Sequence, residues 1–353
     1  MITPNPIMGT LVHAIGGGAA ACCYLPFEKV KKWSYESFWL VQAMFAWLIV
    51  PIIVGFCTVP DLMTVYKDAP MYAIVVPILL GALYGFGGMA FGFAIRNIGY
   101  SLTYTISIGI SAVFGTIVPL LLEGTMIAQF TRPGGGVYFI GMMISLLGII
   151  VCGLAGYRKE RDLSAAGGDA AKGFNMKKGL ALTLFAGVLS GVFGVALFIA
   201  KPVSEIAAAH GAGHFVSNAA QILPSVGCLV TNLIWFTVVS IKNNTLKELV
   251  PSKNENKGRY AANLLLSSFA GSLWYLQFLF LGMANVRMGE FEFAGWGLHM
   301  FMLIFFSFII GLIMKEWKNV TKKTFSTLIV ALILLLISFV VMTYGSMIGE
   351  GMV

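Results

Sequence analysis

Ten stretches of this 353-residue chain contain no Lys, Arg, Asp or Glu, and each is long enough to span a membrane as a helix. Crossing the roughly 30 Å of bilayer hydrocarbon takes about 20 apolar residues in α-helical form. A transmembrane β-strand would need about 10 residues of strict alternation, and these stretches do not alternate. The pattern predicts an all-α polytopic membrane protein with ten transmembrane helices. The stretches are 1–27, 37–60, 71–95, 97–122, 133–157, 179–200, 206–241, 260–286, 293–314 and 324–349.

The overall composition agrees with a membrane protein. The chain is 58% hydrophobic and 11% charged, whereas soluble domains are about 25% charged. Residues 71–122 hold one charge, Arg96, and are too long for a single crossing, so we expect two helices joined by a tight turn. No Lys or Arg precedes the first apolar stretch, and we therefore expect no cleavable signal peptide.

The basic residues are distributed unevenly between the loops. Nineteen of the 23 follow odd-numbered stretches, and four follow even-numbered ones. The positive-inside rule then predicts that the odd loops are cytoplasmic and that both termini lie on the outer side of the membrane. The net charge of +8 is thereby a consequence of topology, and a nucleic-acid partner is not expected.

The polar segment "RKERDLSAAGGDAAKG" divides the chain into two halves of five stretches. We predict a first five-helix repeat over 1–157, a cytoplasmic linker over 158–178 and a second five-helix repeat over 179–353. An odd number of helices per half gives the two halves opposite orientations, which is the inverted repeat of many secondary transporters. Residues 81–99 and 271–289 show weak internal similarity, with shared glycines at corresponding positions.

Several function classes find no support in the sequence. The four aspartates are scattered in loops, so no magnesium site is indicated, and no P-loop or H-E-x-x-H motif is present. No C-x-x-C or Cys/His spacing predicts a metal or other cofactor. We expect a transporter rather than an enzyme or a channel. The cysteines, all in uncharged stretches, are Cys22, Cys23, Cys57, Cys152 and Cys228.

Titratable residues near the ninth stretch are candidates for proton coupling, because such groups are costly in a membrane. Glu292 and His299 lie seven residues apart, which is two turns along one face if the segment is helical. Gly295 and Gly297 lie between them and offer a break in the helix instead. A structural interpretation also stays open, in which Glu290 and Glu292 belong to a loop and His299 binds a neighbouring helix.

Aromatic and amide side chains in the eighth stretch suggest a sugar site. Trp274 and Gln277 share a helical face, with Tyr275 beside them; an aromatic plane and an amide together suit a sugar ring and its hydroxyls. Lys201 and Glu205 are spaced for an ion pair, structural or gating, on a short helix begun by Pro202. His210 and His214 follow as loop histidines.

Several segments resemble those of one family, the L-rhamnose–proton symporters of the drug/metabolite transporter superfamily. The resemblance extends along essentially the whole chain. Its motifs are "YLPFEKVKKWSYE" (24–36), "AKPVSEIAAA" (200–209), "LWYLQF" (273–278), "WGLHM" (296–300) and "GLIMKEW" (311–317).

The resemblance implies import of L-rhamnose, a 6-deoxy sugar, with a proton across the bacterial inner membrane. It implies proton coupling at Glu292 and His299 and sugar binding by Trp274, Tyr275, Gln277, His13 and Trp296. An exporter on the same scaffold, or a symporter of another small sugar, stays as the alternative. The implied partners are the sugar, the proton and the lipid bilayer. The segment "MANVRMGEFEF" departs from the family pattern at Glu290.

Overall fold

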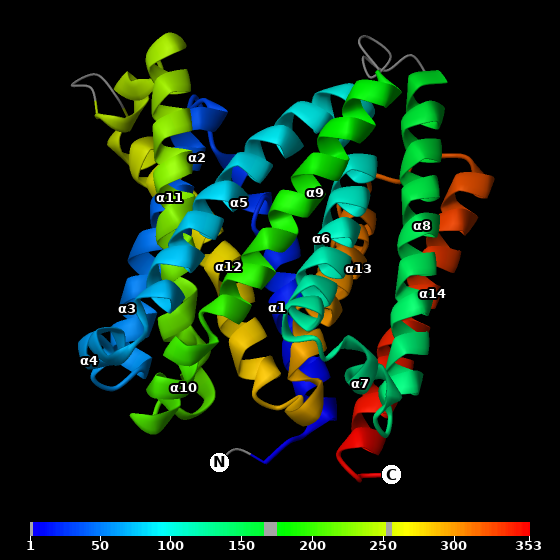
Figure 1. The fold of residues 1–353 in the computed structure, drawn as a ribbon. Coiled ribbons are helices and arrows are strands. Elements are labelled where there is room, and N and C mark those ends of the chain that lie inside the picture. The colour runs from blue at the N-terminus through cyan, green and yellow to red at the C-terminus, as the bar shows by residue number, and fades with distance from the viewer. Residues whose placement is uncertain (1–2, 166–174, 252–255) are drawn as a thin grey trace. The chain divides into compact units, whose positions relative to one another are not determined.

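A computed structural model describes residues 3–165, 175–251 and 256–353, and every regular element in these ranges is a helix (Figure 1). The helices are α1 (Pro6–Cys22), η1 (Leu25–Lys29), α2 (Tyr35–Met44), η2 (Phe45–Ile49), α3 (Val50–Thr58), α4 (Leu62–Asp68), α5 (Met71–Ile98), α6 (Tyr100–Glu123), α7 (Met126–Thr131), α8 (Gly135–Ala165), α9 (Met176–Ile199), α10 (Lys201–Ala209), η4 (Gly213–Phe215), α11 (Ser217–Lys242), η5 (Leu246–Leu249), α12 (Lys257–Asn285), η6 (Gly289–Ala294), α13 (Gly295–Ile313) and α14 (Lys322–Gly349).

Ten segments in the described part of the chain are long and apolar enough to cross a membrane, which confirms the predicted number. They are Pro6–Lys29, Tyr35–Thr58, Met71–Ile98, Ser101–Glu123, Gly135–Leu163, Lys177–Ala209, Gly213–Lys242, Lys257–Asn285, Gly289–Ile313 and Lys322–Gly349. The protein is therefore an all-helical, multi-pass membrane protein.

The turns between helices follow from local sequence. The predicted turn after Arg96 is the single residue Gly99, whose φ of 82° lies in the region that favours glycine. At the other end of α6, the C-cap is Gly124, whose N–H donates to the carbonyls of Leu120 and Leu121. Thr321 caps the start of α14 by accepting a hydrogen bond from the Thr324 N–H.

The linker predicted over 158–178 is largely helical where it is described. Helix α8 continues to Ala165 and α9 begins at Met176, so both transmembrane helices extend into the linker. Residues 166–174 lie outside the described residues. The division into two repeats at this segment stays a prediction.

The helices form two compact units. Unit 1 comprises Met1–Gly18, Gly87–Val195 and Met283–Val353. In unit 1, α8 and α14 run side by side (Figure 1), and the Ser145 hydroxyl donates to the Ser338 hydroxyl across them at 2.6 Å. The glycines of α9 serve close packing: a Cβ on Gly187 or Gly191 would lie 2.8 Å from a side-chain atom of α6.

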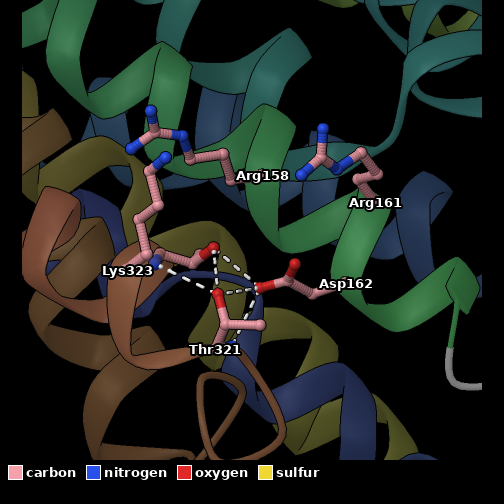
Figure 2. A pocket seen from close by; sticks show the side chains of 6 residues that line it. Arg158, Arg161, Asp162, Thr321 and Lys323 are labelled. Carbon is pink, nitrogen blue, oxygen red and sulfur yellow. Dashed lines mark hydrogen bonds between the residues drawn. The ribbon is translucent and has the colours of Figure 1, made fainter.

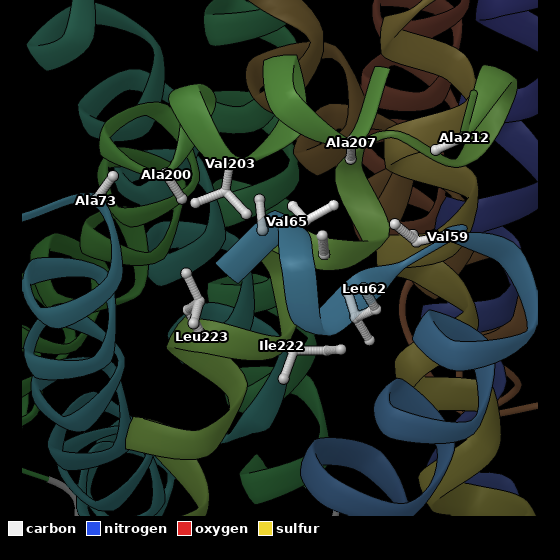
Figure 3. Close-up of a cluster of buried hydrophobic side chains, with 12 residues drawn as sticks. Val59, Leu62, Val65, Ala73, Ala200, Val203, Ala207, Ala212, Ile222 and Leu223 are labelled. Atoms are coloured by element: carbon white, nitrogen blue, oxygen red, sulfur yellow. The ribbon is translucent and has the colours of Figure 1, made fainter. Parts of the chain in front are cut away.

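Unit 2 comprises Ala19–Phe86 and Ala196–Gly282. One apolar cluster of this unit joins α4, α10 and α11, with Leu62 and Val65 of α4 among the side chains of the other two helices (Figure 3). The Tyr66 hydroxyl donates to the Ala219 carbonyl at 2.8 Å. Burial raises the pKa of Tyr66 well above its ordinary value, so this hydroxyl keeps its proton.

The second cluster of unit 2 packs α11 against α2 and η2. Trp39 donates its indole N–H to the Asn232 side-chain oxygen at 2.9 Å, and Trp47 packs beside them. Segment η2 is a π-helical turn, and Pro51 follows it directly in α3. A proline cannot donate to the preceding turn, which accounts for the altered hydrogen bonding at this point.

Candidate functional site

Two histidines from distant parts of the chain meet inside unit 1. His13 of α1 and His299 of α13 are both fully buried, and their Nδ1 atoms lie 3.5 Å apart. The rings meet edge to face, with centroids 5.6 Å apart. The approach of the two helices depends on Gly17, where a Cβ would lie 3.0 Å from the backbone nitrogen of Leu303. Sequence reasoning named both histidines but assigned them separate roles.

The geometry of the pair allows one added proton but not two. Between two facing Nδ1 atoms, only one donates a hydrogen and the other must accept it. A single added proton on the outer nitrogen of the donor ring keeps this hydrogen bond and makes it charge-assisted. A second proton would put two N–H groups against each other. In the part of the chain that the structure describes, neither buried Nε2 atom has a hydrogen-bond partner, so the pair has unfilled sites for a proton or a polar ligand.

Glu292 does not share a helical face with His299, which corrects one of the two arrangements considered from the sequence. Helix α13 begins at Gly295, and Glu292 lies before it in the 3₁₀ segment η6. The change from 3₁₀ helix to α-helix between Glu292 and His299 falls at Gly295, one of the two glycines considered from the sequence, whereas the non-helical residue Phe291 (φ −102°, ψ 15°) lies before Glu292. Glu292 is exposed, and the structure brings His13 to His299 instead.

Glu290 belongs to a network at the same end of unit 1. Its carboxylate pairs with the Arg132 guanidinium, and its backbone N–H donates to the Glu350 carboxylate at 2.6 Å. Arg132 also donates to the Glu290 carbonyl at 3.0 Å. The structural interpretation of Glu290 is therefore the one that the contacts support.

Trp296 is held by packing contacts in unit 1. Its indole N–H donates to the Ser111 carbonyl at 3.0 Å, and its ring stacks on Phe193 with centroids 6.1 Å apart. A Cβ on Gly194 would lie 2.8 Å from the indole, so this glycine makes room for the ring. With its donor already used, Trp296 has a structural role in this arrangement.

The predicted sugar residues lie together on α12 in unit 2. Tyr275 is fully buried and Gln277 is 2% exposed. The Trp274 indole nitrogen, the Tyr275 hydroxyl and the Gln277 amide nitrogen are all buried without a hydrogen-bond partner among the described residues. Buried polar atoms nearly always have partners, so three such atoms within four residues indicate a place where a polar ligand binds.

Two further residues of this kind were missed from the sequence. Gln42 and Trp47 are 2% and 4% exposed, and the Gln42 side-chain oxygen and Trp47 indole nitrogen have no hydrogen-bond partner. The Trp47 ring meets the Trp274 ring edge to face at 6.2 Å, and Tyr24 meets Trp274 at 6.1 Å. The signal that was overlooked is Pro51, which marks the π-helical turn carrying Trp47.

The Lys201 and Glu205 side chains are both exposed on the short helix α10, which has Pro202 in its first turn as predicted. Among the ion pairs in the described ranges, none joins Lys201 to Glu205. His210, at the end of α10, instead lies 3.6 Å from the Asp61 carboxylate. A gating role for Lys201 and Glu205 stays a prediction.

Comparison with known proteins places these observations in a family context. The profile of the family described as L-rhamnose-proton symport protein matches residues 3–349. The chain is 32% identical over 350 residues to the L-rhamnose-proton symporter of Yersinia pestis (strain Pestoides F), covering 98% of both chains. The same identity and coverage hold for the L-rhamnose-proton symporter of Yersinia pseudotuberculosis serotype O:1b (strain IP 31758). These similarities do not favour the exporter alternative.

Proposed function

Because the chain belongs to the L-rhamnose-proton symport protein family, we propose that it imports L-rhamnose together with a proton across a bacterial inner membrane. It is a membrane transporter and not an enzyme. The observation that carries the proton-coupled part of the proposal is the buried contact between His13 and His299. Unperturbed histidine changes charge closest to neutral pH of all side chains, which suits a group that must load and release a proton.

His13 and His299 together hold the transported proton in this proposal. His13, first considered a sugar ligand, is reassigned because the polar contact that its side chain makes within the described residues is with His299. Glu292 is exposed in η6, just before the helix that carries His299, and serves to pass protons between water and the histidine pair. The pair loads one proton and releases it when the protein changes state, because the two states differ in the surroundings of the rings.

Trp274, Tyr275 and Gln277 bind the sugar in this proposal, joined by Gln42 and Trp47. The unpartnered donors of Trp274 and Gln277 suit sugar hydroxyls, and the aromatic rings suit the C–H face and the methyl group of a 6-deoxy sugar. Trp296 is withdrawn from the sugar site because its N–H is already bonded to Ser111.

The assignment of the ten spans to the two units supports transport by alternating access between inverted repeats. If the spans are numbered from one to ten, unit 1 contains the fourth and ninth and the fifth and tenth, and unit 2 contains the second and seventh. The first and sixth spans are each divided between units, as are the third and eighth. Corresponding spans of the two halves therefore either fall in the same unit or are both divided between the units, as an inverted repeat requires.

The proton assignment is tested with the purified chain in proteoliposomes. Replacing His299 or His13 by Gln should lower proton-driven accumulation of L-rhamnose at least about tenfold, because one proton carrier is lost. Counterflow of labelled L-rhamnose, which needs no net proton movement, should persist and shows that each variant is folded. Full accumulation in both variants would remove the histidine pair from the mechanism.

The substrate is tested separately by adding a panel of sugars to lightly buffered cells and recording external pH. We expect alkalinisation with L-rhamnose, because each imported sugar takes a proton from the medium. Alkalinisation by another sugar and none by L-rhamnose would contradict the substrate while keeping the symport mechanism.

A further inference from the structure

A cationic pocket lies in unit 1 where α8 ends and α14 begins (Figure 2). Its volume is about 360 Å³, and it is not part of the sites described above. The lining residues are Arg158, Arg161, Asp162, Thr321, Lys323 and Thr324. Three of these side chains carry a positive charge and only one carries a negative charge.

Asp162, the one acidic residue that lines this pocket, already accepts hydrogen bonds from α14 and its N-cap. The Asp162 carboxylate accepts hydrogen bonds from the Thr321 N–H and hydroxyl, each at 2.9 Å, and from the Thr324 hydroxyl at 2.7 Å (Figure 2). It therefore caps the N-terminus of α14 and stabilises that helix end. This one carboxylate, which also interacts electrostatically with Arg161, faces three cations, so the lining of the pocket has an excess of positive charge.

The three cations come from both helices. Arg158 is half-buried and is fixed by donating one guanidinium N–H to the Thr327 hydroxyl of α14. Arg161 and Lys323 are exposed, and no ion pair in the described ranges includes them. Asp162 offsets only one of these three positive charges, so a bound anion would reduce the remaining repulsion, and a planar guanidinium offers paired donors to phosphate oxygens.

An exposed apolar stripe leads along α8 directly to this pocket. It continues at helical spacing through residues that are each 38% exposed or more and ends at Arg161. On α14, Phe325 is 41% exposed close to the pocket. Such aromatic side chains beside basic ones are typical of the bilayer–water interface. The stripe residues are Met143, Leu147, Ile150, Leu154 and Tyr157.

We propose that this pocket binds the phosphate headgroup of an anionic phospholipid, with Arg158, Arg161 and Lys323 around the phosphate and an acyl chain along the α8 stripe. The stripe distinguishes a lipid from a free phosphate ion, because it supplies an apolar surface that a small anion does not use. The bound lipid bridges α8 and α14 and stabilises their contact.

The test compares binding of three ligands by the full chain, purified in a mild non-ionic detergent. The ligands are phosphatidylglycerol, phosphatidylcholine with the same acyl chains, and inorganic phosphate. Native mass spectrometry measures bound lipid, and the thermal unfolding midpoint measures stabilisation. We expect phosphatidylglycerol alone to be retained and to raise the midpoint by several degrees.

The variant Arg161→Gln with Lys323→Gln removes two pocket charges from exposed positions and leaves the Arg158 and Asp162 contacts intact. It should bind phosphatidylglycerol more weakly by roughly fivefold for each removed cation. The control is Lys242→Gln with Lys247→Gln, which removes the same charge from exposed positions in unit 2. Equal weakening in the control, equal retention of phosphatidylcholine, or the same stabilisation by inorganic phosphate would each overturn the proposal.

Discussion

At the scale of single residues, the buried polar atoms separate structural groups from functional ones. Gln221 and Gln277 are both nearly fully buried in unit 2. Among the described residues, each side chain has one amide atom without a hydrogen-bond partner: the oxygen of Gln221, whose nitrogen donates to the Phe278 carbonyl at 2.6 Å, and the nitrogen of Gln277. Leaving a buried polar group unpaired costs about 1–3 kcal/mol. At Gln277 this cost falls on a donor beside the unpartnered polar atoms of Trp274 and Tyr275, which is the pattern expected of a ligand-binding residue.

The two glutamines give a matched pair of variants. Gln277→Met should stabilise the protein by about 1 kcal/mol, because it removes an unpaired amide, and should raise the KM for L-rhamnose at least about tenfold. Gln221→Met loses the hydrogen bond to the Phe278 carbonyl together with an unpartnered oxygen, so it should stabilise the protein less than Gln277→Met and change the KM less. Thermal unfolding and uptake kinetics measure both effects. A stabilised Gln277→Met variant with unchanged KM would contradict the sugar site.

At the scale of helices, glycines occur wherever the chain passes from one compact unit to the other. The boundaries fall inside helices after residues 18, 86, 195 and 282. A glycine is at or beside each boundary, namely Gly18, Gly87, Gly194 and Gly282. Glycine lowers the stability of a helix interior by roughly 0.5–1 kcal/mol relative to alanine. A helix that must bend during transport bends most easily at such a position.

Gly18 offers a clean test of bending. A Cβ there would have no neighbour closer than 4.0 Å, so Gly18→Ala adds no clash and should stabilise α1 by about 0.5–1 kcal/mol. If α1 bends during transport, the variant should nevertheless lower the turnover of L-rhamnose several-fold.

Gly92→Ala in α5 is the control for Gly18→Ala. No atom lies within 4 Å of a Cβ at this position, and Gly92 lies within unit 1 away from a boundary. It should stabilise its helix equally and leave turnover unchanged, as measured by uptake in proteoliposomes. Equal turnover in both variants would show that α1 does not bend at Gly18.

At the scale of the whole molecule, the two ends of the chain lie together in unit 1. The Asn5 N–H donates to the Arg287 carbonyl at 2.8 Å, and the Thr10 and Thr343 hydroxyls lie 2.7 Å apart. An even number of crossings requires both termini on the same side of the membrane. The excess of basic residues in odd loops predicts that this side is the periplasm.

Reporter fusions test this orientation. A reporter that is active only in the cytoplasm should be silent at the C-terminus, and one that is active only in the periplasm should be active there. A fusion in the loop between α8 and α9 should give the reverse result, and it serves as the control for expression. A cytoplasmic C-terminus would show that the charge bias does not determine the orientation of this protein.

The sequence alone determined the fold class and the number of spanning helices. In a membrane, each segment must satisfy its own backbone hydrogen bonds and match the bilayer thickness by itself, so length and apolarity are sufficient evidence. The sequence also identified His299, Trp274 and Gln277 as unusual, because a polar residue in an apolar stretch can be recognised without any knowledge of its neighbours in space.

Only the tertiary structure decided which of these residues meet. His13 and His299 are 286 residues apart, and their contact depends on the approach of α1 to α13 at Gly17. Glu292 is close to His299 in sequence, yet it belongs to the 3₁₀ segment η6, which ends before α13 begins at Gly295. The free donors of Gln277 and the occupied donor of Trp296 are likewise properties of packing. Partnership in a folded chain depends on contacts between distant segments, and no local pattern encodes those contacts.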